Sequence, residues 1–157
     1  MWEALQHAEW VSLLATSRWL YGLVSVVHYS AVFFCVGTIT LRDLRILGFA
    51  NPHRTLSAFA DQLRPSMWVA LAAVVISGFL LFTVNAGNFA AATPFLLKMI
   101  IIVLAVMSAV TIEWKFAKWD RAPLMPLTAR LVALISIVLW LGALLISVEV
   151  PALTGLG

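Results

Sequence analysis

The sequence predicts an all-α integral membrane protein folded as a four-helix bundle. Hydrophobic residues make up 63% of the 157 residues and charged residues 11%, which is roughly half the charged share of a soluble domain. Four apolar stretches are each long enough to cross a bilayer as a helix, at about 17–41, 66–85, 94–113 and 129–149. Basic residues collect in two of the connections between them. We therefore expect a single transmembrane domain within the lipid bilayer.

The first span lies between Arg18 and Arg42, with no formal charge between them. Before it, residues 1–15 place apolar side chains largely on one helical face, which predicts a short interfacial helix. The alternative is a terminus that becomes ordered only against a neighbour. Because Glu3 and Glu9 lie near the start and no basic segment precedes them, we expect no cleaved signal peptide.

The connection after the first span contains a second helical pattern. Leu56, Phe59 and Leu63 recur at helical spacing, which predicts another interfacial helix that begins after residues 51–52 and ends before Pro65.

Proline and asparagine residues set the other expected boundaries. Residues 85–88 should end the second span, and Pro94 suits the first turn of the third helix. Glu149 and Pro151 should end the fourth span.

Eight of the ten basic residues fall in the first and third connections. They are Arg42, Arg45, Arg54, Arg64, Lys115, Lys118, Arg121 and Arg130. The positive-inside rule then places both termini on the non-cytoplasmic side. This grouping is typical of membrane topology, so we expect no nucleic-acid partner. Among the acidic residues, Glu113 should pair with a nearby lysine or arginine, and Asp43 with Arg42 and Arg45.

His28 lies near the middle of the first span, where an ionisable group is costly and normally faces protein, water or a cofactor. It shares a polar stripe that should face the bundle interior, formed by Tyr21, Ser25, His28, Cys35 and Thr38. Counting from each helix start puts His28, the Ser77–Gly78 pair and Trp140 at similar depth.

Two hypotheses for His28 follow. In the first, it is the metal ligand of a haem b-type tetrapyrrole, Gly78 leaves room for the ring, and Trp140 stacks near it. In the second, no cofactor is bound, and a neutral His28 is hydrogen-bonded to a serine or carbonyl on another helix. His7 and His53 lie outside the spans, so a sixth ligand would come from a methionine, water or a partner chain. Copper or small-solute transport is a third hypothesis, weakened because the softer ligands are not clustered.

Several sequence features form one pattern: His28 followed by Gly37 and LRDLRILG (41–48), then SGFLLF (77–82), PFLLK (94–98) and S-x-x-L-W-x-G (136–142). Together they resemble a group of small four-helix bacterial inner-membrane proteins of uncharacterised activity. The group is similar in style to membrane b-type cytochromes and copper-resistance membrane proteins, so the resemblance implies residence in the bacterial inner membrane. Two departures argue against a bis-histidine or two-haem site. Glu113 stands where members often have a histidine, and Ser147-Val148 replaces a glycine-arginine pair.

No metal-binding Cys/His spacing, phosphate-binding glycine loop or nucleophile–base pair occurs in the sequence. We therefore expect that the chain is not an enzyme on its own. It should act with other membrane subunits or as a homo-oligomer, either passing electrons and anchoring a redox partner or serving as a cofactor-free accessory subunit. Small residues such as Gly22, Ser25 and Gly37 are candidates for helix contacts.

Overall fold

The computed structural model describes residues 7–49, 55–122 and 124–154, with side chains up to residue 147. This part of the chain is helical and contains no strand. Its helices are α2 (Glu9–Thr16), α3 (Arg18–Leu47), α4 (Leu56–Val84), α5 (Ala86–Ala91), α6 (Thr93–Asp120) and α7 (Leu127–Thr154). Four of them, α3, α4, α6 and α7, are long and apolar enough to cross a membrane. The predicted all-α four-helix membrane fold is confirmed.

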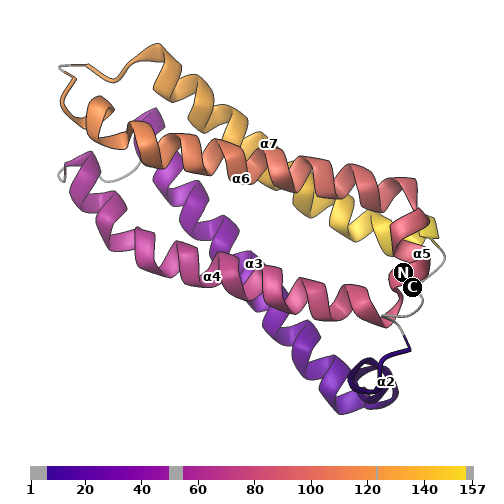
Figure 1. The fold of residues 1–157 in the computed structure, drawn as a ribbon. Coiled ribbons are helices and arrows are strands. Elements are labelled where there is room, and N and C mark those ends of the chain that lie inside the picture. The colour runs from indigo at the N-terminus through magenta and orange to yellow at the C-terminus, as the bar shows by residue number, and fades with distance from the viewer. Residues whose placement is uncertain (1–6, 50–54, 123, 155–157) are drawn as a thin grey trace.

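The four long helices form two antiparallel hairpins, α3–α4 and α6–α7, which lie one above the other in Figure 1. The C-termini of α3 and α6 and the N-termini of α4 and α7 lie at one end of the bundle, here called the basic end. Helices α2 and α5 lie at the opposite end, here called the terminal end. Contacts between the hairpins run chiefly through α3 and α7. Each spanning helix therefore packs most closely against the other helix of its own hairpin.

Local sequence signals explain where α3 begins and ends. The Ser17 hydroxyl accepts a hydrogen bond from the Leu20 N–H at 3.3 Å and so caps the N-terminus. At the other end Gly48 adopts φ 95°, in the left-handed region that only glycine enters without strain. The Phe49 N–H then reaches the Leu44 carbonyl at 2.9 Å, which closes the last turn. Pro94 lies in the first turn of α6, as predicted.

Pro65 does not end a helix, contrary to the sequence prediction. The helical segment expected in the first connection exists, but it is the first part of α4, which continues through Pro65 to Val84. A proline removes one backbone hydrogen bond, whereas Leu56 and Ala60 before it are buried in the core and hold that segment in line. Pro151 likewise lies inside α7, which extends to Thr154 rather than ending near residue 149. The N-terminal helix is described from Glu9 to Thr16, and residues 1–6 lie outside the described part.

Two buried clusters hold the bundle together. The cluster at the basic end draws on all four long helices and contains Ile46, Leu56, Ala60, Ile112, Phe116, Trp119, Ala129 and Ala133. The next one along the axis contains Cys35, Val36, Ile39, Met67, Ala70, Ala105 and Trp140. Several members are alanines on α6 and α7, and small side chains let transmembrane helices approach closely.

The terminal half of α3 is more open than the sequence analysis expected. Cys35 and Thr38 of the predicted polar stripe are buried, but Tyr21 is 45% exposed. A Cβ placed at Gly22 or Gly37 would meet no atom within 4 Å, so neither glycine lies against another helix in the described part of the chain. At Gly22 the reason is the packing of α3, because α6 and α7 lie apart from its terminal half (Figure 1).

Candidate functional site

His28 contacts α4 at the level of Ser77 and Gly78. Its Nδ1 lies 2.9 Å from the Ser77 hydroxyl oxygen. Ser77 is buried, with 4% of its surface exposed, while His28 is partly exposed. The contact joins α3 to α4 through two residues 49 positions apart in the sequence.

The second bond of Ser77 fixes the direction of the first. The Ser77 hydroxyl donates its single proton to the Ala73 carbonyl at 2.5 Å, one turn back in α4. It can therefore only accept from His28, in the tautomer that carries its proton on Nδ1. In that tautomer the lone pair of a neutral His28 lies on Nε2. A ring nitrogen held in this way is also the arrangement found behind most metal-binding histidines.

Gly78 provides the space for the His28 ring. A Cβ built on Gly78 would lie 3.0 Å from His28 Cε1, closer than an ordinary van der Waals contact, and 3.6 Å from Nδ1, within the ordinary range. The sequence predicted that Gly78 leaves room for the flat ring of a tetrapyrrole. In the structure, the ring that lies against Gly78 is the imidazole of His28.

Trp140 lies at a different depth from His28. Trp140 belongs to the buried cluster with Cys35 and Ile39, while Ser136, one turn earlier in α7, lies beside Asp43. Since α3 and α7 run antiparallel, Trp140 is level with Ile39, which is 39 − 28 = 11 residues from His28. At 1.5 Å per residue the offset along α3 is about 16 Å. The structure therefore brings two of the predicted site residues, His28 and Gly78, together, and Trp140 lies apart from them.

A buried ionic network lies near the basic end, where the sequence analysis expected only interfacial ion pairs. Arg42 is 2% exposed and Asp43 is fully buried. Asp43 Oδ1 accepts from Arg42 Nε at 3.0 Å and from Nη2 at 2.9 Å. Arg42 Nη1 also lies 3.6 Å from the Met67 sulfur on α4.

Glu113 connects this pair to a second arginine. Its Oε1 accepts from Arg42 Nη1 at 3.3 Å, and its Oε2 accepts from Arg64 Nε at 2.7 Å. Arg64 in turn pairs with the exposed Asp61. The predicted pairing of Glu113 with a nearby arginine, and of Asp43 with Arg42, is confirmed. The network joins α3, α4 and α6 through a single carboxylate.

The sequence reading missed how deep this network lies. It took Arg42 as the end of the first span, but α3 continues to Leu47 and keeps Arg42 and Asp43 inside the bundle. One signal for this network was present in the sequence. Acidic and basic residues alternate on segments that the topology places at the same end of the bundle.

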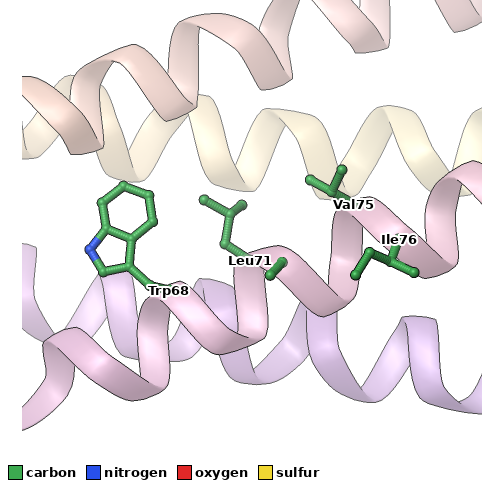
Figure 2. A pocket seen from close by; sticks show the side chains of 5 residues that line it. Trp68, Leu71, Val75 and Ile76 are labelled. Atoms are coloured by element: carbon green, nitrogen blue, oxygen red, sulfur yellow. The ribbon is translucent and has the colours of Figure 1, made fainter.

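A shallow apolar groove of about 340 Å³ follows the face of α4 lined by Trp68, Leu71, Ala72, Val75 and Ile76. Figure 2 shows Trp68, Leu71 and Val75 rising from α4 toward the ribbons of α6 and α7. Its lining side chains are suited to hydrocarbon rather than to a polar ligand. Among the described residues, no group of three or more His, Cys, Asp or Glu side chains is placed to hold a metal ion.

Comparison of the chain with protein-family models, with curated proteins and with solved structures gave no match.

Proposed function

We propose that this chain is an accessory membrane subunit, in which His28 fastens α3 to α4 and the assembly extends beyond the single chain. The observation that carries the proposal is the hydrogen-bond chain from His28 Nδ1 to Ser77 and on to the Ala73 carbonyl. A mid-span histidine that is bonded across a helix pair, with its ring against a glycine, is satisfied as a packing group.

The terminal half of α3 supports a partner within the membrane. Trp19 is 89% exposed, Leu23 61% and Val26 64%, and His28 beside them is partly exposed at mid-span. Lipid accepts the apolar side chains, but an imidazole is costly in hydrocarbon. A neighbouring subunit or a second copy of this chain would cover it.

A double-mutant cycle tests the fastening role. His28→Ala, Ser77→Ala and the double variant are unfolded in mixed micelles, and the coupling free energy is compared with about 0.6 kcal/mol, the average for hydrogen bonds between transmembrane helices. Ser108→Ala serves as the matched control, because the Ser108 hydroxyl donates to the Ala105 carbonyl of its own helix. Additive effects of His28 and Ser77 would contradict the proposal.

Binding of a haem b-type tetrapyrrole through His28 is a second candidate function, with electron transfer or anchoring of a redox partner as the role. It is favoured by one observation: the Nδ1–H bond to Ser77 leaves Nε2 as the lone pair available to iron. Visible absorption of the chain, purified in mild detergent alone and with its native partners, distinguishes haem binding from the cofactor-free accessory role. A Soret band that is lost in His28→Ala, with the protein still inserted, supports haem. A colourless wild-type complex overturns it.

We also propose that the basic end faces the cytoplasm of a bacterial cell, with both termini on the other side of the inner membrane. The eight basic residues that lie in the two connections or in the helix ends beside them support this orientation.

A further inference from the structure

Three buried polar atoms lie along the contact between α3 and α7. They are Asp43 Oδ2, Ser136 Oγ and Trp140 Nε1, and none has a hydrogen-bond partner among the residues that the structure describes. Asp43 and Ser136 are fully buried and Trp140 is 5% exposed. Buried polar groups in native proteins nearly always bond to protein or to ordered water.

The positions of these atoms bring them toward one another. The Ser136 side chain lies beside the Asp43 carboxylate, although it does not reach hydrogen-bond geometry with it. Trp140 follows Ser136 by four residues, so the two share one face of α7. Helical side chains lean toward the N-terminus of their helix, a direction that would carry the Trp140 indole toward the turn of Ser136.

The Ser136 hydroxyl behaves unlike other hydroxyls of the long helices. Ser77, Ser108 and Ser147 each donate to a backbone carbonyl of the preceding turn, at 2.5, 2.6 and 2.6 Å. Ser136 makes no such bond. Its hydroxyl thus remains available to the space shared with Asp43.

The chemistry of the three groups selects the ligand. The indole N–H only donates, the free carboxylate oxygen only accepts, and the hydroxyl does either. The indole N–H, together with the Arg42 guanidinium on the same carboxylate, disfavours a cation, and Asp43 disfavours an anion. A small neutral molecule that both donates and accepts satisfies all three.

We propose that Asp43, Ser136 and Trp140 form a buried water site between α3 and α7. The water accepts from Trp140 Nε1–H and donates to Asp43 Oδ2, while Ser136 completes its shell. Asp43 Oδ1 keeps both bonds to Arg42. The site extends the ionic network from α3 to α7, and it is independent of whether His28 binds a cofactor.

The first test measures contact between Trp140 and water in the full-length chain. Indole ¹⁵N labelling in detergent micelles gives a Trp140 cross-peak, which Trp140→Phe assigns by its loss. We expect a through-space contact from Trp140 Nε1–H to water, and at least a twofold loss of its intensity in Ser136→Ala. Ser147→Ala is the matched control on the same helix and should leave the contact unchanged. Absence of the contact in the wild type, or equal intensity in Ser136→Ala, overturns the proposal.

A second measurement separates a bound water from the serine hydroxyl itself. Infrared spectra of the wild type are compared in H₂¹⁶O and H₂¹⁸O, because the oxygen of water exchanges and that of serine does not. We expect an O–H band that shifts with the isotope and disappears in Ser136→Ala. A Ser136-dependent band that does not shift assigns the hydroxyl alone and overturns the water site.

Discussion

Replacing Glu113 by glutamine removes the charge that joins α6 to two arginines of the opposite hairpin. Glu113 is 12% exposed and accepts from Arg42 and from Arg64. Glutamine keeps the length of the side chain and its carbonyl oxygen, so the change tests the charge rather than the packing. Arg42 remains held by Asp43.

The two lost interactions differ in strength. Charged hydrogen bonds contribute about 1.5–3 kcal/mol when buried. The Arg42 bond, at 3.3 Å, belongs at the lower limit. The Arg64 bond is shorter, at 2.7 Å, but Arg64 is 41% exposed, so solvent screening reduces it to about 0.5 kcal/mol. We expect Glu113→Gln to lower the free energy of unfolding by about 2 kcal/mol, or roughly 30-fold in the equilibrium constant.

The assay is reversible unfolding in mixed micelles of a mild detergent and dodecyl sulfate, followed by tryptophan fluorescence. Asp61→Asn is the matched control, because Asp61 pairs with the same Arg64 but is 60% exposed. Its expected cost is below about 0.5 kcal/mol. The reasoning from buried charge is wrong if Glu113→Gln lowers the free energy of unfolding by less than about 0.5 kcal/mol. It is also wrong if Asp61→Asn lowers that free energy by as much as Glu113→Gln does.

Two further predictions concern packing and orientation. Gly78→Ala should lower the free energy of unfolding by about 1 kcal/mol or more, because its Cβ would lie 3.0 Å from His28 Cε1. Gly142→Ala is the control: its Cβ would meet no atom within 4 Å, so the change should be neutral or stabilising by up to about 1 kcal/mol. Equal effects in the micelle titration would contradict the close contact at Gly78. A cysteine replacing Asn88 should react with a membrane-impermeant maleimide from outside the cell, and one replacing Arg121 only after permeabilisation, with the buried Cys35 left in place. The opposite labelling pattern would reverse the proposed topology.

The fold class followed from the sequence because bilayer thickness and helix geometry convert composition directly into structure. Four apolar stretches of spanning length leave few alternatives to four helices. Two local signals were also interpreted correctly from the sequence. Pro94 lies in the first turn of α6, and α4 ends just before Asn85. The pairing of Glu113 with an arginine was predictable from topology alone, since both connections with basic residues lie at the same end.

Other features depended on which helix faces meet. Pro65 is a helix-ending signal when read alone, yet burial of Leu56 and Ala60 keeps α4 continuous. Helix periodicity gave Tyr21 and Cys35 the same face, but α6 and α7 cover only one of them. Such differences arise because the burial of a side chain depends on where neighbouring helices cross its own helix. Sequence spacing does not contain this information.

The candidate sites show the same division. The sequence alone determined that His28 is an unusual ionisable group at mid-span and that an inward tryptophan lies in the fourth helix. Only the tertiary structure decided their neighbours, Ser77 and Gly78 for His28 and the Cys35 cluster for Trp140. Counting residues from the starts of antiparallel spans gives equal depths only if the counted residues lie at the centre of each helix. Here α3 runs from Arg18 to Leu47, so His28 lies nearer the terminal end than the count implied.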